Sequence, residues 1–555
     1  MQRNLVALAD TGFDLLVIGG GITGAFLAHD AVLRGLSVAL VEKDDFGGFT
    51  SSASSKLLHG GVRYLPKGQV WKVRESYREA AIFQHIAPHL TRWLPFLIPT
   101  QSGSLMKGEA AMRIAMELYG LCSLGLDNLI ADPGKRPPRR AFLGSQEVRA
   151  KAPLLGELPG LTGAQILWES HMHNSERMTL AVIKTAVQGG AQVANYCAVK
   201  RLLSHGDQVT GALVQDRLSG QEFPLKARFT INAAGPHVQA INQSLPGLQL
   251  KRRVTAFSKG AHLVTKPLAA DYALALTTGK KLEGIVSRGG RHCFIIPWRD
   301  RSLIGTTNVP FTGSLDEVRV TATDIVDFLD DINSALPGLH LSPGDVHYSF
   351  CGLYPLIAKD VQTDTYQGTG EFQVIDHQQQ GVQGMLTVLG AKYTTARWVA
   401  EKGMDLAMNK LGYAGSRCQT ASRQLVEGAI GSLRDFQEDC RRQYGHELPQ
   451  GMLDELCRNH GLALHRLIAA GRQHNLLQPV AGSDILAIEI DHAIREEMAM
   501  TLDDLVFRRT GLGTIGRPDA AALGYCASRM ASALGWSEDE SKRQLAAVHA
   551  RYEYV

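Results

Sequence analysis

The sequence predicts an α/β protein in which a Rossmann-like dinucleotide-binding domain is interleaved with an antiparallel-sheet domain and followed by an all-α domain. Three observations predict this fold: a strand, turn, helix and strand near the start, short alternating strands over residues 253–307, and polar amphipathic helices after residue 416. A chain of 555 residues also exceeds the size at which one hydrophobic core stops growing, so several domains are expected.

The composition is that of an ordinary globular protein, with 45% hydrophobic and 20% charged residues. A net charge of +4 gives no reason to expect a nucleic-acid partner. The eight cysteines show no C-x-x-C spacing, which indicates reduced thiols in the cytoplasm. The longest apolar run, residues 15–28, is broken by four glycines and is shorter than the roughly 18 residues that cross a bilayer, so no transmembrane helix is expected.

The first fifty residues read as one βαβ unit. "FDLLVIGG" (13–20) is an apolar run suited to a buried parallel strand, and "SVALVEK" (37–43) is a second β-branched run. Between them, "AFLAHDAVLRG" (25–35) has helical spacing and ends in glycine. The unit therefore predicts two adjacent parallel strands with a helix packed over them.

Gly19, Gly21 and Gly24 form G-x-G-x-x-G between that strand and helix, and Glu42 closes the second strand. The glycines allow a tight turn and close backbone approach, the helix N-terminus receives a pyrophosphate, and Glu42 binds the ribose hydroxyls. This context predicts a dinucleotide site.

The fingerprint and Glu42 do not separate FAD from NAD, but one later segment points to FAD, and another would contact the adenine of the dinucleotide. Residues 228–238, "RFTINAAGPHV", read as a strand entering a tight turn, where Gly235 and Pro236 let backbone lie against a flat cofactor, a pattern that resembles FAD proteins. Residues 180–203 read as a helix, a Gly-Gly stop and a strand, on which Val199 offers backbone groups to an adenine.

The remaining organisation is coarser. Residues 64–150 read as mainly helical, with a Pro- and Arg-rich loop at 132–140, and another helix begins near Thr395. The expected division has FAD-binding segments at about 12–65, 185–240 and 350–415, substrate-binding segments at about 66–184 and 241–349, and a helical domain at 416–555.

At "SSASSKLLHGGVRYL" (51–65) the chain resembles the FAD-dependent glycerol-3-phosphate dehydrogenases, membrane-associated flavoproteins that pass electrons to quinone. The resemblance covers the first 410 residues well and the C-terminal region loosely, through "LDDLVFRRTGLG" (502–513). It implies a fold like that of glycine and D-amino-acid oxidases. Further motifs carry it: "NAAGPHV" (232–238), "KGAHLV" (259–264), "IPWRDRSLIGTTN" (296–308), "GLYPL" (352–356) and "LGAKYTTARWVAEKG" (389–403).

The resemblance assigns roles to the residues that follow the nucleotide fingerprint. Small hydroxyl side chains would wrap the pyrophosphate and the flavin edge, because they allow close approach while donating hydrogen bonds. The group consists of Ser51, Ser52, Ser54 and Ser55.

The substrate side would be formed by Arg63 and Tyr64, whose guanidinium and ring contact substrate, together with His262 and Lys392. Lys392 precedes the predicted helix, whose first amides, at Tyr393, Thr394 and Thr395, would face the flavin oxygens, with Lys392 beside them.

Two histidines are candidates for the general base. His262 is preferred, because an unperturbed imidazole titrates near neutral pH, and His59 is its competitor.

One position departs from the family pattern. The family motif is Gly-(Leu or Val)-Arg-Pro-Leu, and its arginine contacts the substrate anion, whereas this chain has Tyr354. Either another cation, such as Lys359 or Arg291, replaces it, or the substrate carries less negative charge. Asn308 also stands where an aspartate is usual.

The segment "WESHMHNSERMTL" (168–180) resembles the acidic "DDAR" region of the family. Asn174 and Glu176 replace its aspartates, and Arg177 is retained. The H-x-H pair His171 and His173 has no third ligand at short spacing, so no metal is expected.

The resulting prediction is FAD-dependent oxidation of sn-glycerol 3-phosphate to dihydroxyacetone phosphate, with quinone as acceptor. Two alternatives stay open: a paralogue for another polyol phosphate or a less charged hydroxy compound, and a flavin-binding subunit without catalysis. The resemblance also implies peripheral attachment to the inner face of the cell membrane and suggests a homodimer. The apolar helix predicted at 105–122 would either lie in the membrane interface or pack in a core.

Overall fold

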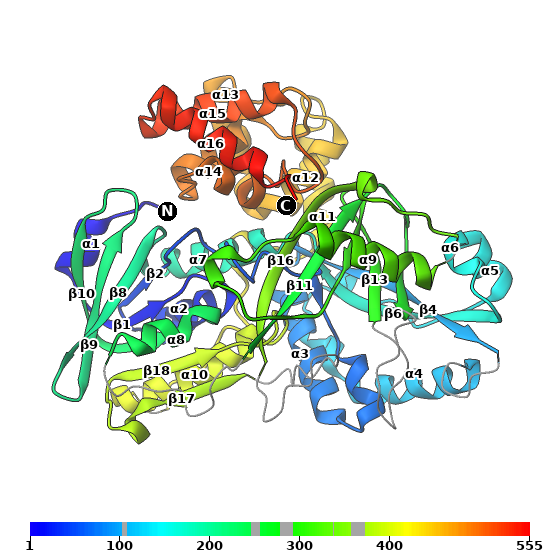
Figure 1. Cartoon of the computed structure of the whole chain (residues 1–555), viewed down its shortest axis with the longest axis horizontal. Helices are drawn as coiled ribbons and strands as arrows, with labels where there is room; N and C mark the ends of the chain where they lie inside the picture. The colour runs from blue at the N-terminus through cyan, green and yellow to red at the C-terminus, as the bar shows by residue number, and fades with distance from the viewer. Residues whose placement is uncertain are drawn as a thin grey trace.

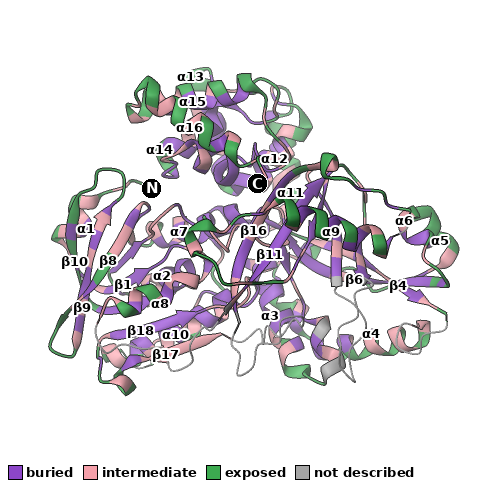
Figure 2. Cartoon of the chain, in the orientation of Figure 1, coloured by how far each residue is buried: buried purple, intermediate pink, exposed green. Residues whose placement is uncertain are grey.

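The structure is a computed structural model that describes residues 1–102, 108–245, 256–277, 292–336, 338–356, 372–413 and 415–554. Within them two sheets lie side by side, and the C-terminal helices sit over both as a separate layer (Figure 1). The central strands of both sheets are buried, whereas the outer helices expose one face (Figure 2).

The first sheet contains the predicted βαβ unit. Its central strands are parallel, and β1 pairs with β2 on one side and β10 on the other. An antiparallel ribbon, β8 and β9, extends from β10. In spatial order the strands are β17 (Gln373–Asp376), β18 (Met385–Leu389), β10 (Glu222–Asn232), β1 (Gly12–Ile18), β2 (Val38–Val41) and β7 (Gln192–Ala194), with β8 (Cys197–His205) and β9 (Gln208–Asp216) attached.

The second sheet is mostly antiparallel, as the alternating short strands predict. Its path runs β15 (Val309–Phe311), β11 (Ala256–Thr265), β14 (Arg301–Gly305), β13 (His292–Trp298), β12 (Ala273–Thr277), β4 (Thr91–Gln101), β6 (Leu161–Met172) and β3 (Leu57–Leu58), with β16 (Val346–Leu356) paired to β11 and β5 (Phe142–Gly144) paired to β6. Because β16 belongs here, this sheet extends beyond the boundary near residue 350 that the sequence analysis drew.

Helices cover the sheets according to their apolar faces. Against the parallel sheet, α2, α7 and α10 bury Leu27, Ile183 and Val399 in one shared core. Before the C-terminal domain, the described residues form the α-helices α1 (Leu5–Asp10), α2 (Ile22–Leu33), α3 (Val70–Ile86), α4 (Glu109–Ser123), α5 (Ser145–Lys151), α6 (Pro153–Gly156), α7 (Ser175–Gln188), α8 (Val238–Gln243), α9 (Ala322–Ala335) and α10 (Ala396–Leu411).

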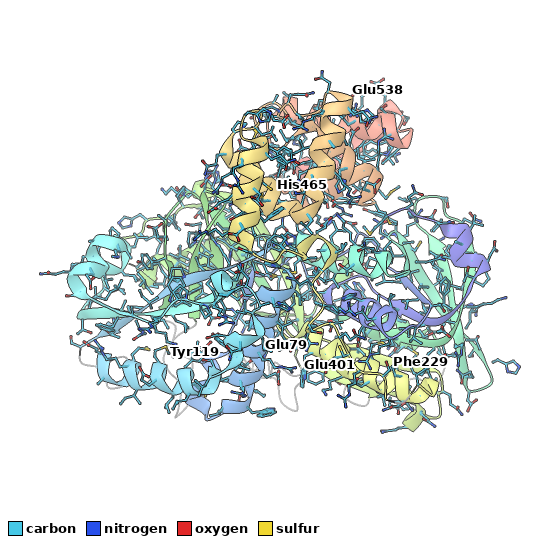
Figure 3. The ribbon with its side chains drawn as sticks, turned by 180° about the vertical axis from the view of Figure 1, so that it is seen from behind. Glu79, Tyr119, Phe229, Glu401, His465 and Glu538 are labelled. Carbon is cyan, nitrogen blue, oxygen red and sulfur yellow. The ribbon has the colours of Figure 1, made fainter. Side chains whose placement is uncertain are left out.

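A buried ion pair ties α10 to α3. The Arg397 guanidinium donates two hydrogen bonds of 2.7 Å to the Glu79 carboxylate and one of 2.8 Å to Glu401. Figure 3 labels Glu79 and Glu401, the two acidic residues that pair with this arginine. Such a pair fixes where the loop before α10 meets the rest of the molecule.

The C-terminal domain has a core of its own and shares a second core with the antiparallel sheet. In the shared core, Phe507 stacks on Tyr348 of β16, with ring centroids 5.4 Å apart. The helices of the C-terminal domain are α11 (Leu433–Tyr444), α12 (Gln450–His460), α13 (Leu464–His474), α14 (Ala487–Glu496), a π-helix (Asp504–Arg509), α15 (Ala520–Leu534) and α16 (Glu538–Ala550).

The region between residues 64 and 150 differs from the expectation of a mainly helical segment. It contains α3 and α4, but residues 91–101 form β4, which pairs along its whole length with β6. Tertiary pairing decides this strand, because Pro95 and Pro99 interrupt the local pattern and the partner strand lies 60 or more residues away. None of the helices in the described part of the chain combines the length and hydropathy of a membrane-spanning segment.

Candidate active site

The glycine fingerprint packs as tightly as a dinucleotide site requires. A Cβ on Gly24 would lie 1.9 Å from the carbonyl oxygen of Gly19, so only glycine fits there. Gly19 itself has φ +107°, and a Cβ on it would lie 2.7 Å from the carbonyl oxygen of Ala233. The turn after β1 and the "NAA" turn after β10 therefore meet backbone to backbone.

Ser51 and Glu42 complete this end of the site. The Ser51 hydroxyl accepts a 3.0 Å hydrogen bond from the amide of Ile22, the first residue of α2, where a pyrophosphate binds in such folds. The Glu42 carboxylate accepts from the amides of Gly20 at 2.7 Å and Asp44 at 3.0 Å. Burial raises the pKa of Glu42 to about 7.

Other predicted cofactor residues lie around the same edge. Val199 is on β8, two residues after Cys197, whose amide donates to the Glu42 carbonyl at 2.7 Å. Gly235, with φ +55°, and Pro236 form a short 3₁₀ turn directly after the "NAA" residues. Thr394 and Thr395 are buried immediately before α10.

The loop that carries Ser51, Ser52, Ser54 and Ser55, which we call the serine loop, lies over the β11 and β16 strands. Gly352 of β16 allows this approach, since a Cβ there would lie 2.9 Å from Cβ of Ala53. Ser52 donates to the Phe49 carbonyl at 2.8 Å, and Ser54 accepts from the Lys56 amide at 3.2 Å. Two of the four serines thus make bonds within their own loop.

Lys56, which the sequence analysis did not single out, anchors this loop from below. Its ammonium donates to the Ser52 carbonyl at 2.7 Å, to Ser175 at 2.9 Å and to the Glu176 carboxylate at 2.7 Å, and it is fully buried. Burial lowers the pKa of Lys56, and the nearby Glu176 opposes that shift. Lys56 stands inside the 51–65 motif and Glu176 inside the "NSER" segment, but no local pattern pairs the two residues.

His262 faces the serine loop from β11. Its Nε2 lies 2.8 Å from the Ser55 hydroxyl, and its ring stacks on Phe350 with a centroid separation of 5.0 Å. Gly305 leaves room for the ring, because a Cβ there would come within 2.2 Å of it. The side chain is 3% exposed, and burial together with Lys56 lowers the pKa of His262 to about 3.

His59 has the opposite environment. Its side chain is 44% exposed, and its Nδ1 lies 4.0 Å from a carboxylate oxygen of Glu169. Glu169 is buried, accepts from the Gly60 amide at 2.6 Å, and has its pKa raised to about 7 by burial. The His59 ring also contacts Phe294 of β13. Phe294 pairs with Gly305 of β14, and Gly305 pairs in turn with His262 of β11. Both histidines therefore face one region.

Lys392 and Tyr64, both expected to contact substrate, lie against each other. The Lys392 ammonium lies 4.5 Å from the centroid of the Tyr64 ring, a cation–π contact that places both at the junction of the serine loop and α10. The side chain of Arg63 lies outside the described residues, although its backbone belongs to a 3₁₀ turn (Val62–Lys67).

Tyr354 and Asn308, the two departures from the family pattern, contact each other. The Tyr354 hydroxyl donates to the Asn308 side-chain oxygen, which also accepts from Ser258. A Cβ on Gly260 would lie 3.9 Å from the Tyr354 ring, so the ring borders the same sheet face as His262. The cations suggested as substitutes, Lys359 and Arg291, lie outside the described residues.

Arg177 contributes to the domain interface. It donates to Glu497 at 2.6 Å and to the Asn459 carbonyl at 2.9 Å, both in the C-terminal domain. Asn174 caps α7 by accepting from the amides of Glu176 and Arg177. His171 is buried on β6, and His173 lies 3.0 Å from Glu455.

Comparison with known proteins agrees with this geometry. Residues 14–397 match the family model of the FAD-dependent oxidoreductases, and residues 418–541 match that of the C-terminal domain of α-glycerophosphate oxidase. A glycerol-3-phosphate dehydrogenase of Synechocystis is 30% identical over 100% of this chain and 98% of its own length. The chain belongs to the FAD-dependent glycerol-3-phosphate dehydrogenase family.

Other members of the family agree in length and shape. The aerobic glycerol-3-phosphate dehydrogenase of Bacillus subtilis is 30% identical over 92% of this chain and 89% of its own. The crystal structure of the Bacillus halodurans glycerol-3-phosphate dehydrogenase with FAD superposes with a TM-score of 0.74 at 26% identity, covering 98% of this chain and 95% of that one. The fold alone is shared with the L-α-glycerophosphate oxidase of Mycoplasma pneumoniae, at 16% identity and a TM-score of 0.52 over 72% of this chain and 95% of that one.

FAD is the cofactor of this family, and the residues present fit it. Glycines stand where any side chain would fill the cradle, at Gly19 and Gly24, and a Cβ on Gly390 would lie 2.8 Å from the Thr23 hydroxyl. The carboxylate of Glu42, the hydroxyl of Ser51 and the start of α2 supply the polar groups that a dinucleotide needs.

Gly24→Ala is expected to weaken FAD binding by about 10- to 100-fold, because overpacking of this kind costs about 1–3 kcal/mol. The added methyl would push against Gly19 and open the turn. Titration of apoprotein with FAD, followed by flavin fluorescence, measures the change. Gly12→Ala is the control, since a Cβ at Gly12 meets nothing within 4 Å. Equal affinities for the two variants would contradict the prediction.

Proposed function

We propose that this protein oxidises sn-glycerol 3-phosphate to dihydroxyacetone phosphate with FAD as hydride acceptor, and that the electrons pass to a membrane quinone. The observation that carries the proposal is similarity along the whole chain, including the C-terminal domain, to proteins named for this dehydrogenase activity. Supporting it, residues assigned to the site by the resemblance contact each other in two pairs, Tyr64 with Lys392 and Ser55 with His262.

The reaction breaks the C2–H bond of the substrate and removes the hydroxyl proton. Bound FAD supplies the acceptor for the hydride at N5. We propose that two cations hold the phosphate of the substrate: Arg63 through paired hydrogen-bond donors, and Lys392 as a point charge.

The proton must go to a basic side chain, and the structure favours His59 over His262. A base with a pKa near 3 is a weak proton acceptor at neutral pH, and His262 is buried with its Nε2 occupied by Ser55. His59 reaches solvent, and the Glu169 carboxylate stabilises an imidazolium. We therefore propose His59 as the general base and His262 as a substrate contact and positioning group.

Anaerobic reduction of the purified holoenzyme tests the activity. We expect sn-glycerol 3-phosphate to bleach the flavin absorbance, and a soluble quinone analogue to restore it. Rapid bleaching by a different polyol phosphate, with none by sn-glycerol 3-phosphate, would assign the protein to a paralogous dehydrogenase. Retention of FAD with no bleaching by any alcohol would indicate a non-catalytic subunit.

The Tyr354–Asn308 contact bears on the substrate. A cation and an anion of the family pattern are both replaced by neutral groups that bond to each other, so the net charge at this place is unchanged. That coupling supports a phosphorylated substrate rather than a less charged one.

The double variant Tyr354→Arg with Asn308→Asp is expected to lower KM for sn-glycerol 3-phosphate about tenfold, the effect of one added charge-assisted hydrogen bond. Steady-state kinetics of the double variant and of Asn308→Asp alone measure it. The single variant puts a carboxylate opposite Tyr354 without its cation, so we expect its KM to rise. A double variant with unchanged KM would contradict the assignment of this place to the phosphate site.

Helix α4 supports peripheral attachment to a membrane. It buries Met116 and Tyr119 but exposes Ile114, Leu118 and Leu121 on one stripe, with Leu121 67% exposed. It packs against α3, at whose start Trp71 is 76% exposed. Exposed apolar side chains gathered in this way are typical of a surface that meets lipid or another protein.

Leu118→Glu with Leu121→Glu is expected to reduce binding to lipid vesicles at least about tenfold, because two charges would enter the apolar layer. Cosedimentation with vesicles measures binding, and the rate of flavin bleaching should be unchanged. A matched pair of exposed apolar residues away from α4, Leu462→Glu in the C-terminal domain with Val326→Glu on α9, should bind as the parent does. Equal binding by the parent, the α4 variant and the control would contradict the assignment of α4 to the membrane-binding surface.

The homodimer stays a prediction.

A further inference from the structure

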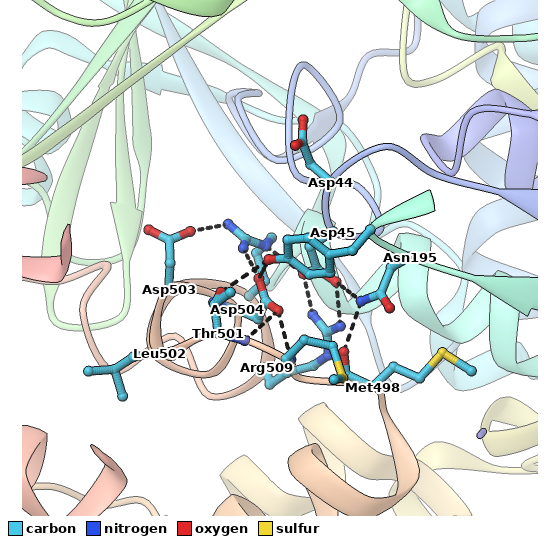
Figure 4. A network of polar contacts seen from close by, with 12 residues as sticks. Asp44, Asp45, Asn195, Met498, Thr501, Leu502, Asp503, Asp504 and Arg509 are labelled. Atoms are coloured by element: carbon cyan, nitrogen blue, oxygen red, sulfur yellow. Dashed lines mark hydrogen bonds and ion pairs between the residues drawn. The ribbon is translucent and has the colours of Figure 1, made fainter. Parts of the chain in front are cut away.

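The C-terminal domain meets the adenosine side of the FAD cradle through a buried cluster of charged and polar groups (Figure 4). One part of it comes from loops at the ends of β2 and β7, and the other from the π-helix. We call it the Asp45 cluster, and it consists of Asp45, Asn195, Tyr196, Asp504, Arg508 and Arg509.

Asp45 is the centre of this cluster. Arg509 donates to both of its carboxylate oxygens at 2.7 Å, Arg508 donates at 2.6 Å, and the Asn195 amide donates at 3.1 Å. The Asp45 side chain is 1% exposed. Burial by itself would raise the pKa of Asp45, but the two guanidinium groups outweigh it and lower that pKa to about 2. The carboxylate is therefore charged and fully coordinated.

Asp504 balances the second cation from within the C-terminal domain. It pairs with Arg508, accepts from the amides of Met500 and Thr501, and accepts a 2.8 Å hydrogen bond from the Tyr196 hydroxyl. Asn195 also donates to the Met498 carbonyl at 2.9 Å. Both loops of the nucleotide-binding domain are thus held by groups of the C-terminal domain.

Because the dinucleotide motif assigns Glu42 to the ribose hydroxyls, these two loops would border the adenosine half of FAD. The Tyr196 amide donates to the Asp44 carbonyl at 2.8 Å, and the Cys197 amide donates to the Glu42 carbonyl at 2.7 Å. The Glu42 carboxylate in turn accepts from the Asp44 and Gly20 amides. A short series of bonds therefore leads from Arg509 through Asp45 to the glycine turn.

The position of the cluster is unusual for a contact that serves only to join two domains. The two domains have other contacts outside the Asp45 carboxylate, such as Arg177 to Glu497, whose carbonyl also accepts from Arg509 at 3.0 Å, and Arg299 to the Gly511 carbonyl at 2.8 Å. Burying two arginines against the loop of Glu42 adds a desolvation cost that apolar side chains would avoid. A fully coordinated carboxylate instead fixes one loop conformation.

We propose that the C-terminal domain is a cofactor-positioning element, in which Arg508 and Arg509 act through Asp45 to hold the Glu42 loop in the conformation that binds the adenosine half of FAD. Arg508 and Arg509 are positioning residues, because they reach the cradle through other side chains: both through Asp45, and Arg508 also through Asp504 and Tyr196. The proposal rests on FAD as the cofactor and is independent of which alcohol is oxidised.

The test measures binding of FAD and of ADP, a probe for the adenosine half, to apoprotein by calorimetry. Arg509→Gln and Asp45→Asn are expected to weaken both ligands at least about tenfold, within the usual range of coupling between a contact and a ligand site. Arg509→Lys, which keeps the charge but not the paired donors, should fall between them and the parent. Arg299→Gln is the matched control at another interdomain contact and should bind both ligands as the parent does.

A contact that only joined the domains would give a different result. It would lower the melting temperatures of apoprotein and holoprotein equally and leave both dissociation constants unchanged. Positioning predicts that the increase in melting temperature caused by FAD becomes smaller in the cluster variants. If Arg509→Gln or Asp45→Asn does not fold, Tyr196→Phe removes one hydroxyl and carries the same prediction. Unchanged affinity for FAD and ADP in every folded cluster variant, or equal loss in Arg299→Gln, overturns the proposal.

Discussion

His59→Gln is expected to bind FAD normally but to reduce it with substrate about 10² to 10⁴ times more slowly than the parent, the range for loss of a general base. Glutamine keeps the size and polarity of the side chain but cannot accept a proton near neutral pH. The reason for choosing His59 is its environment, half exposed and 4.0 Å from the buried carboxylate of Glu169. Anaerobic single-turnover reduction measures the rate, and the acid limb of the kcat/KM profile should disappear.

His262→Gln is the matched comparison. Because burial holds the pKa of His262 to about 3, its loss should remove a contact rather than a base. We expect a higher KM with a reduction rate at saturation within about tenfold of the parent. The reverse pattern, with His262→Gln nearly inactive and His59→Gln nearly normal, would return the role of base to His262, as the sequence analysis preferred.

Arg397→Met is expected to destabilise the protein by about 3–5 kcal/mol, the cost of leaving a buried charge without its partner. Arg397 is completely buried, and Glu79, its bidentate acceptor, is 1% exposed. Burial already raises the pKa of Glu79 and Arg397 opposes that, so without the arginine the carboxylate would have to take up a proton or leave its place. Urea unfolding of the holoenzyme, followed by fluorescence, measures the change.

The double variant Arg397→Met with Glu79→Leu separates pairing from packing. Removing both charges abolishes the uncompensated carboxylate, so the double variant should be more stable than Arg397→Met alone. Arg434→Met, in an exposed pair with Glu438, serves as the surface control and should change stability by less than about 1 kcal/mol. A double variant as unstable as the single one would show that packing of the arginine, rather than its charge, stabilises α10 against α3.

Much of the fold was predictable because its signals are local. The strand, glycine turn and helix of residues 12–33 are contiguous, so spacing alone predicts the nucleotide cradle, and the structure places Gly19 against Gly24 as that motif requires. The antiparallel sheet and the helical C-terminal domain were likewise predicted from period and composition. The strand β4 was not, because its pairing with β6 overrides a local pattern that contains prolines.

The site was predictable only in its parts. The sequence placed Ser55 and His262 in the site, but their contact joins residues 207 positions apart. Nothing local indicated that Lys56 would be buried under the serine loop or that Glu176 would neutralise it. Tyr354 and Asn308 each stood out as a departure, but only the structure shows that one bonds to the other.

The sequence by itself determined the cofactor class, the order of the motifs and the family, because these depend on short runs of residues with fixed spacing. Only the tertiary structure decided which histidine reaches solvent, which cations are already paired, and what the C-terminal helices contact. Those properties depend on burial and on distances between segments, as in the contact of Asp45 with Arg509, 464 positions away. Desolvation and charge pairing act through space, so they emerge only when the chain has folded.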